Sequence, residues 1–191
     1  MKKRLIVGIS GASGVIYGIR LLEILRDIDS IETHVVISSM AAENIKIETH
    51  FQVQDVENLA DVIYDCSNLA ASISSGSFLT AGMIVIPCSM KSLSGIVNCH
   101  NDNLLIRAAD VTLKEGRKLV VSPRETPLHK GHLELMLKFV DHGGVLVPPF
   151  PAFYSSPKTI TDIIDHTLGK ILDQFEIKHD LFKRWSGKSI V

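Results

Sequence analysis

The chain has few of the residues that characterise several specialised classes of protein. Its three cysteines, Cys66, Cys88 and Cys99, are too few and too scattered for a disulfide framework or a zinc site. A formal net charge of −1 provides no field that would attract nucleic acid or an anionic membrane. No apolar run is long enough to span a bilayer. These shortages favour a cytoplasmic protein with no metal, no nucleic acid and no membrane among its partners.

The amino terminus has only some features of a secretion signal. Residues Lys2 to Arg4 precede an apolar stretch, but glycines and serines from Gly8 to Gly14 interrupt it, so we predict the first strand of a sheet instead. The 191 residues are 46% hydrophobic, which is enough to build one core. We therefore predict a single domain over residues 1–191.

Short apolar runs alternate with segments of helical periodicity, which predicts a doubly wound α/β sheet. Most of the runs are almost purely apolar, as in parallel strands that are covered on both faces. The expected strands are Leu5–Ile9, Thr33–Ile37, Met83–Ile86, Leu119–Val121 and Val145–Val147. The expected helices are Val15–Arg26, Ala41–Thr49, Leu93–Cys99, Asn103–Lys114, Leu133–His142 and Pro157–Gln174.

Polar turns follow four of these strands, at Gly8–Gly14, Ser38-Ser39, Pro87–Ser92 and Ser122–Pro127. In doubly wound sheets, ligands bind beyond the carboxyl ends of the strands, near the point where the strand order reverses. The first turn opens a helix, so its N–H groups and the positive helix end suit an anion such as a phosphate. Its glycines match neither the dinucleotide nor the ATP-loop fingerprint. A tight turn without a ligand is the alternative.

The loop at Pro87–Ser92 is a second run of small hydroxyl residues and contains Lys91. Its N–H and O–H donors suit a phosphate or a ribityl chain. Alternatively, Ser89 or Ser92 only caps the helix that follows.

Two pairs of charged residues suggest an anion site, and each has a structural alternative. Arg107 and Lys114 lie seven residues apart on one expected helix and therefore share a face. They could reach one anion, or form a solvated face bridged by Asp110. Arg124 and Glu125 are held between two prolines, which suits phosphate binding and proton transfer, or equally a structural ion pair.

Isolated residues give weaker signals. Glu48 ends an expected helix, where the helix dipole opposes a carboxylate, and this unfavourable position hints at a function. Tyr154 and Trp185 could line an apolar site or simply pack. His129 and His132 have no partner at a spacing that would complete a metal site, so we assign no metal.

Together these motifs resemble the flavin prenyltransferase family (UbiX-like), which includes the small subunits of aromatic acid decarboxylase systems. The resemblance covers nearly the whole chain, from Gly8 to about Trp185. Its motifs are Gly11-Ala12-Ser13-Gly14, Pro87-Cys88-Ser89, Arg107-Ala108-Ala109-Asp110-Val111, Leu113-Lys114-Glu115, Pro123-Arg124-Glu125-Thr126-Pro127, Pro151-Ala152-Phe153-Tyr154 and Arg184-Trp185.

The resemblance implies a Rossmann-like (flavodoxin-like) domain that binds FMN and assembles as a dodecamer, with active sites at subunit junctions. A tail of about residues 176–191 would pack on a neighbouring subunit. Family members join a dimethylallyl group from dimethylallyl monophosphate to N5 and C6 of reduced FMN without a metal. The prenylated FMN then serves a UbiD-type decarboxylase.

The resemblance also assigns site residues. FMN contacts fall on Gly11, Ala12, Ser13, Ser38, Ser89, Met90, Lys91, Ser92 and Arg124. The prenyl phosphate would lie among Ser75, Arg107, Lys114, Glu125, Tyr154 and Lys170, with Trp185 covering the allyl pocket. Glu48 would help to move a proton at the flavin, and Ser13 and Glu125 would relay one to or from the departing phosphate.

The chain departs from the family pattern at one of these positions, where arginine is usual and Lys170 stands here. Lysine keeps the charge but loses the two-point grip on phosphate, which would weaken prenyl-phosphate binding. Two rival functions stay open. FMN-dependent cysteine decarboxylases share this fold, although their Pro-x-Met-Asn-type motif and catalytic histidine are not visible here. A non-enzymatic FMN carrier or assembly subunit of a decarboxylase is the other.

Overall fold

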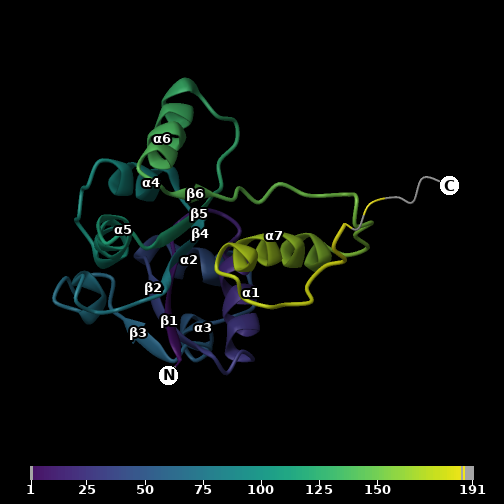
Figure 1. Ribbon diagram of the computed structural model, residues 1–191, viewed down its shortest axis with the longest axis horizontal. Helices are drawn as coiled ribbons and strands as arrows, with labels where there is room; N and C mark the ends of the chain where they lie inside the picture. The colour runs from purple at the N-terminus through teal and green to yellow at the C-terminus, as the bar shows by residue number, and fades with distance from the viewer. Residues whose placement is uncertain (1, 186, 188–191) are drawn as a thin grey trace.

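The computed structural model describes residues 2–185 and 187. A six-stranded sheet forms the centre of the molecule in the order β3-β2-β1-β4-β5-β6, and every neighbouring pair of strands is parallel (Figure 1). The strands are β1 (Lys3–Ile9), β2 (Ile31–Ile37), β3 (Val62–Tyr64), β4 (Gly82–Cys88), β5 (Lys118–Pro123) and β6 (Val145–Leu146). The expectation of a mostly parallel α/β sheet is confirmed.

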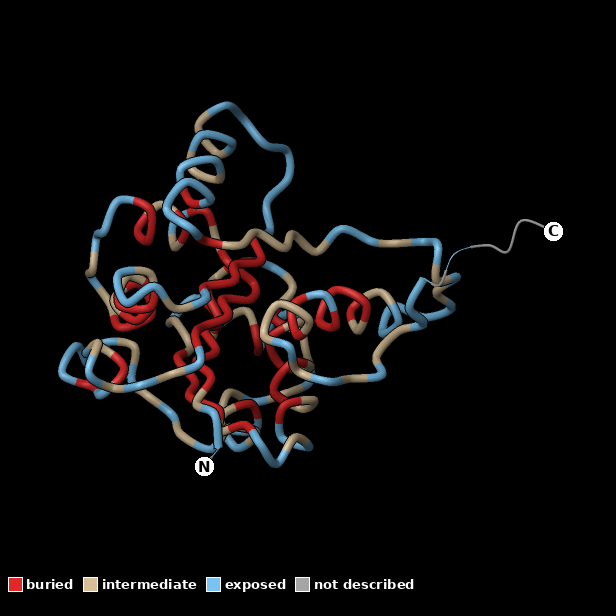
Figure 2. The backbone as a smooth tube through the Cα atoms, viewed as in Figure 1, coloured by how far each residue is buried: buried red, intermediate tan, exposed pale blue. Residues whose placement is uncertain are grey.

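Helices connect the strands and cover both faces of the sheet. They are α1 (Val15–Arg26), α2 (Ser39–Glu48), α3 (Val53–Glu57), η1 (Ser72–Ser74), α4 (Met90–Val97), α5 (Leu104–Lys114), α6 (Lys130–Asp141) and α7 (Ile160–Gln174). One core cluster joins the sheet to α1, α2, α3 and α7, and a second joins it to α4, α5 and α6. Figure 2 shows the buried backbone running through the sheet and the inner sides of these helices.

The sheet has two cores because successive side chains of a strand point to opposite faces. In β1, Leu5 and Val7 belong to the first cluster, whereas Ile6 belongs to the second. In β4, Ile84 likewise faces the first cluster and Val85 the second. Both faces of β1 and both faces of β4 are therefore apolar, as the near-continuous hydrophobic runs in the sequence predicted.

The strand order reverses between β1 and β4, because the chain first builds β2 and β3 on one side and then returns. The order is that of a Rossmann fold, and without the three-residue edge strand β3 it becomes the flavodoxin-like order. The loops after β1 and β4 therefore flank the point where ligands of such sheets bind.

Sequence reasoning missed three short elements, β3, α3 and η1. None has more than five residues, so none shows a full period of hydrophobicity. It also placed several helix starts late. Ser38 and Ser89 cap α2 and α4 directly, so these helices begin at Ser39 and Met90. The helix expected from Pro157 begins at Ile160 instead.

Among the described residues, no helix combines the length and the apolar composition that crossing a bilayer requires. An extended segment at Pro148–Pro151 runs away from the sheet towards the start of α7 (Figure 1). The described part of the carboxyl-terminal tail, up to Trp185, runs back beside α7 of the same chain. Packing of this tail on a neighbouring subunit stays a prediction, and residues 186 and 188–191 lie outside the described part.

Candidate functional site

A cavity of about 790 Å³ lies at the carboxyl ends of the strands, beside the reversal of the strand order. Its size is that of a typical small-molecule site. Five of the residues expected to contact FMN line it, namely Gly11, Ser38, Ser89, Lys91 and Ser92. They come from the loops after β1, β2 and β4, so the topology has brought together turns that are far apart in the sequence.

Three helix amino termini face this cavity. Its lining includes the N-cap residues of α2, α4 and α5, which are Ser38, Ser89 and Asn103. Each cap side chain accepts a hydrogen bond from a backbone N–H of its own helix, over 3.0 to 3.2 Å. The structural role considered for Ser89 is therefore confirmed. The same arrangement directs three positive helix ends at one space, which favours an anionic ligand there.

A buried serine that sequence reasoning missed joins two of these loops. The Ser10 hydroxyl donates to the Pro87 carbonyl over 3.1 Å and accepts from the Ser89 N–H over 2.8 Å. The two partners lie 77 and 79 residues away, so no local pattern signals this contact. Ser10 fixes the loop after β1 against the loop after β4 and thereby sets the width of the cavity between them.

The glycine at position 11 is required by the close packing of the first loop against α2. A Cβ atom on Gly11 would lie 2.4 Å from the Cβ of Met40. Its neighbours Ala12 and Ser13 are not part of the cavity wall; Ala12 is buried and Ser13 is exposed. Of the expected FMN contacts in this loop, only Gly11 borders the cavity.

Glu48 has a clear structural partner. Its carboxylate accepts the N–H of Gly14 over 2.8 Å and that of Val15 over 3.2 Å. Gly14, the N-cap of α1, has no side chain to do this. The end of α2 thus supplies a negative charge to the start of α1, where the helix dipole favours it. Part of the anion-binding capacity expected for the Gly8–Gly14 turn is taken up by this carboxylate.

Met90, Arg124 and Glu125 lie at the same edge of the sheet but outside the cavity wall. Met90 is buried in the first turn of α4. The Arg124 N–H donates to the Cys88 carbonyl over 3.0 Å, which holds the loop after β5 against the loop after β4. Within residues 2–185 no salt bridge joins Arg124 to Glu125, so the alternative of a structural ion pair between them is not supported.

Arg107 and Lys114 on α5 both reach the loop around η1. Arg107 donates to the Ser74 carbonyl over 3.2 Å and to the Asp110 carboxylate over 2.8 Å. The Lys114 amine lies 3.0 Å from where a Cβ on Gly76 would be, and it pairs with Glu115. Asp110 therefore binds one of the two cations and does not bridge both. Ser75 lies in this loop, so three of the expected substrate contacts are brought together here.

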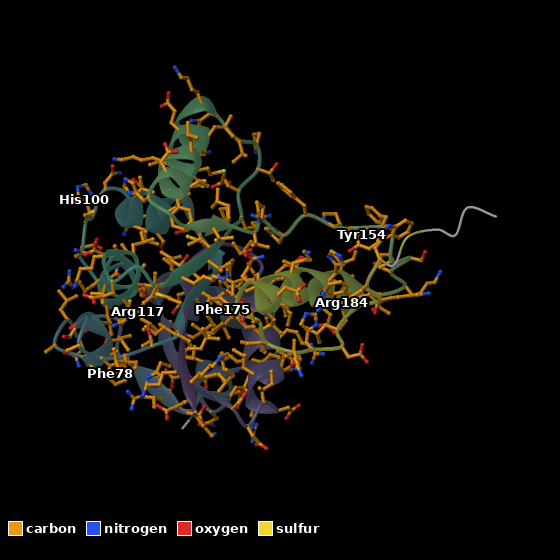
Figure 3. The ribbon with its side chains drawn as sticks, in the orientation of Figure 1. Phe78, His100, Arg117, Tyr154, Phe175 and Arg184 are labelled. Carbon is orange, nitrogen blue, oxygen red and sulfur yellow. The ribbon has the colours of Figure 1, made fainter. Side chains whose placement is uncertain are left out.

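A second group forms where the segment after β6 meets α7. The Tyr154 hydroxyl and the His166 ring nitrogen lie 2.8 Å apart, and the Tyr154 and Trp185 ring centroids are 6.3 Å apart. Burial and, to a smaller extent, the charge of Lys170 lower the pKa of His166. Figure 3 shows Tyr154 at the projecting end of the molecule, near Arg184 of the tail. Sequence reasoning missed His166, because the residue stands alone in α7 without a motif.

One chain does not unite all the expected substrate contacts. Arg107 and Lys114 lie on α5, which covers one face of the sheet, whereas Lys170 lies on α7, which covers the other. Tyr154 and Trp185 accompany Lys170. A single prenyl-phosphate site built from both groups requires more than one copy of the chain.

Another wall of the cavity contains Tyr64, which sequence reasoning also missed. Its hydroxyl lies 2.7 Å from the Ser72 hydroxyl and 2.9 Å from the buried His34 ring, whose other nitrogen lies 2.8 Å from Glu32. The hydrogen bond to His34 lowers the pKa of the Glu32 carboxyl. These contacts fix the Tyr64 ring at the cavity wall. In the described part of the chain, no three His, Cys, Asp or Glu side chains gather closely enough to hold a metal ion.

Comparison with known proteins adds four findings. The model of the Flavoprotein family matches residues 1–183. The flavin prenyltransferase UbiX of Salmonella typhimurium is 59% identical over 187 residues, covering 97% of this chain and 99% of that protein.

Two solved structures are also closely similar. A dodecameric FMN-dependent UbiX-like decarboxylase from Escherichia coli O157:H7 is 51% identical with a TM-score of 0.95, covering 96% of this chain and all of that one. AnUbiX (PadA1), in complex with FMN and dimethylallyl pyrophosphate, is 44% identical with a TM-score of 0.96, covering 99% and 100%.

Proposed function

This chain belongs to the Flavoprotein family and, within it, to the UbiX-like flavin prenyltransferases, and from that membership we propose how its residues perform the reaction. It is an enzyme that joins the dimethylallyl group of dimethylallyl monophosphate to N5 and C6 of reduced FMN. The observation that carries this proposal is the cavity of about 790 Å³ where three helix amino termini, five serines and a lysine converge.

The donors around this cavity fit FMN. The Ser38 and Ser89 hydroxyls each accept a helix N–H, and the Ser89 hydroxyl donates to Ser92. No described residue accepts the hydroxyl hydrogen of Ser38 or of Ser92. The Ser38 and Ser92 hydroxyls and the exposed Lys91 amine are therefore available to hold a phosphate or a ribityl chain. Gly11 lets the first loop approach closely. We assign Ala12, Ser13, Met90 and Arg124 to the same ligand through the adjoining loops.

When bound, reduced FMN supplies the nucleophilic atoms that accept the prenyl group. The chain's own contribution is made at the phosphate that leaves. Breaking the allylic C–O bond puts negative charge on that phosphate, so cations must gather around it and water must be kept away. Arg107, Lys114 and Lys170 supply the cations, and Ser75 supplies a hydroxyl.

Proton transfer completes the chemistry. Ser13 and the exposed Glu125 carboxylate relay a proton to or from the departing phosphate, and Glu48 moves one at the flavin. Tyr154 and Trp185 provide an aromatic wall that favours positive charge on the allyl group. The edge-to-face contact of these two rings, with centroids 6.3 Å apart, supports their assignment to one wall.

We propose a dodecamer in which neighbouring chains complete each substrate site. A chain of 51% identity and almost the same fold is described as dodecameric. Opposite faces of the sheet carry the two groups of substrate residues in this chain, which a composite site between copies would bring together. Large apolar side chains are also exposed on α6 and in the segment before α7, including Leu137, Phe150 and Phe153.

The prenylated FMN would pass to a separate UbiD-type aromatic acid decarboxylase, and we place both proteins in the cytoplasm. Cys66, Cys88 and Cys99 are free thiols in this structure, which is consistent with a reducing compartment. Mixing the purified protein with a candidate decarboxylase and measuring the activity of that decarboxylase tests the transfer.

The reaction itself is tested by incubating the protein with reduced FMN and dimethylallyl monophosphate without oxygen, followed by mass spectrometry of the flavin. A mass gain of one prenyl unit supports the proposal. Unchanged FMN that stays bound indicates a carrier instead. Release of carbon dioxide from a peptide with a carboxyl-terminal cysteine indicates the cysteine decarboxylase alternative.

A further inference from the structure

His166 is a buried titratable residue to which the proposed reaction gives no task. It lies in the middle of α7 and is only 7% exposed. Its Nε2 atom lies 2.8 Å from the hydroxyl of Tyr154, which comes from the segment after β6. A buried polar group costs free energy unless it is hydrogen-bonded, so this contact holds the exposed Tyr154 side chain against α7.

Two aromatic rings pack on the His166 ring and fix its position. The Phe182 ring of the tail lies with its centroid 4.6 Å away, and the Tyr154 ring meets the imidazole edge to face at 5.4 Å. The tail approaches α7 closely here, because a Cβ on Gly169 would lie 2.4 Å from the Phe182 ring. The imidazole therefore has a defined place between the tail and Tyr154.

The protonation state of this imidazole allows the Tyr154 phenol to donate outwards. Burial and, to a smaller extent, the charge of Lys170 lower the pKa of His166, so the ring is neutral near pH 7. A neutral imidazole carries its hydrogen on either nitrogen. With the hydrogen on Nε2, His166 donates to the phenol oxygen, and the phenol O–H is left to donate to a ligand.

A lysine accompanies this hydroxyl. Lys170 follows His166 by four residues and therefore lies on the same side of α7. The Lys170 side chain is exposed and forms no salt bridge within residues 2–185. Arg184, a second cation near Tyr154, is already held by two hydrogen bonds to Asp173, over 2.7 and 3.0 Å. Lys170 is thus left to meet an anion.

We propose that His166 is a positioning residue, which directs the Tyr154 hydroxyl at the prenyl phosphate beside Lys170. This inference rests on the proposed function, which places Tyr154 and Lys170 at the substrate. A lysine binds phosphate as a point charge and lacks the two parallel donors of an arginine. The fixed hydroxyl supplies a second donor, so that Tyr154 and Lys170 together hold the phosphate at two points.

The experiment is a calorimetric titration of dimethylallyl monophosphate into the protein loaded with oxidised FMN. The proposed transfer requires reduced FMN, so this titration measures binding alone. His166→Phe, which keeps a ring but loses the hydrogen bond, should weaken binding about fivefold to tenfold. His166→Gln, whose amide N–H can take the place of Nε2–H, should recover most of the affinity. The matched control is His100→Phe, the same exchange at an exposed residue in the loop after α4 (Figure 3), and it should bind as the unaltered protein does.

Two combined variants distinguish positioning from a merely structural role. In a Tyr154→Phe background, His166→Phe should cause no further loss, because the hydroxyl through which it acts is already gone. Lys170→Arg should tighten binding more in the His166→Phe variant than in the unaltered protein, since its fork replaces the lost donor. Thermal unfolding and FMN affinity report whether the variants fold. If His166→Phe does not fold, His166→Leu, which also lacks the hydrogen bond, takes its place with the same expectations.

The proposal would be overturned by undiminished affinity in His166→Phe, by no recovery in His166→Gln, or by additive losses in the double variant with Tyr154→Phe. An equal effect of Lys170→Arg in both backgrounds would also overturn it, as would the absence of binding to the unaltered protein. The proposed reaction fails separately, if the unaltered protein binds the phosphate ester but forms no prenylated FMN with the reduced flavin. The affinities of the variants would then still decide the role of His166.

Discussion

Replacing Glu48 separates its capping role from its proposed catalytic role. The carboxylate accepts two N–H groups at the start of α1, where Gly14 provides no cap of its own. Glu48→Ala removes both hydrogen bonds and the favourable charge, so we expect the free energy of unfolding to fall by about 1 to 2 kcal/mol. For a chain of this size, that lowers the melting temperature by about 2 to 8 °C.

Glu48→Gln keeps an oxygen that can accept the same N–H groups but removes the charge. Its cost in unfolding free energy should be about 0.5 kcal/mol, the size of one exposed charge–dipole interaction. If Glu48 also moves a proton at the flavin, prenylation should nevertheless fall about 100-fold. The assays are thermal unfolding followed by circular dichroism, and the rate of prenylated FMN formation well below the melting temperature.

The matched control is Glu43→Gln on the same helix, where an exposed carboxylate pairs with Lys46 over 2.9 Å. It should change stability by less than about 0.5 kcal/mol and leave the rate unaltered. A Glu48→Gln variant with full activity would refute the proton role and leave only the cap. A Glu48→Ala variant with an unchanged melting temperature would refute the cap.

Three other predictions concern the substrate residues and the tail. Glu125→Gln should leave FMN affinity unchanged and lower the turnover rate about 100-fold, because the relay is lost while the loop is kept; normal turnover would rule this role out. Arg107→Ala should raise the KM for dimethylallyl monophosphate at least about tenfold while the Kd for FMN changes little; equal losses would move Arg107 to the flavin. Hydrogen bonds from Arg184, and secondarily from His179, lower the pKa of the Asp173 carboxyl, so the hold of α7 on the tail is complete near neutral pH and is lost as the pH falls below about 4. The fluorescence of Trp185, the single tryptophan, should report this release, and Asp173→Asn should show the low-pH spectrum at pH 7; a pH-independent spectrum would contradict it.

The main features of the fold could be predicted from the sequence because they depend on local patterns. Apolar runs such as Leu5–Ile9 identify strands that are buried on both faces, and α1 was predicted with its observed ends. The short elements β3 and α3 could not be found in the same way. Strand β3 is held by pairing with β2, and α3 by its Gln52–Asp55 capping box and the burial of Val56, so neither depends on a periodic pattern of its own.

The residues of the candidate site likewise fall into those that could be predicted from local patterns and those that could not. Gly11, Ser38, Ser89 and Lys91 could be expected together because parallel strands place their carboxyl ends at one edge. Ser10 and His166 could not be predicted as site residues, because they contact their partners Pro87 and Tyr154 only in the folded chain.

The sequence alone determined the class of sheet and the turns that carry ligand-binding residues, because hydrophobic period and turn chemistry are properties of neighbouring residues. Only the tertiary structure decided that Glu48 caps α1, and that Arg107 and Lys170 lie on opposite faces of the sheet. Each of these depends on distances between residues that are remote in the sequence, and such distances are set when the elements pack.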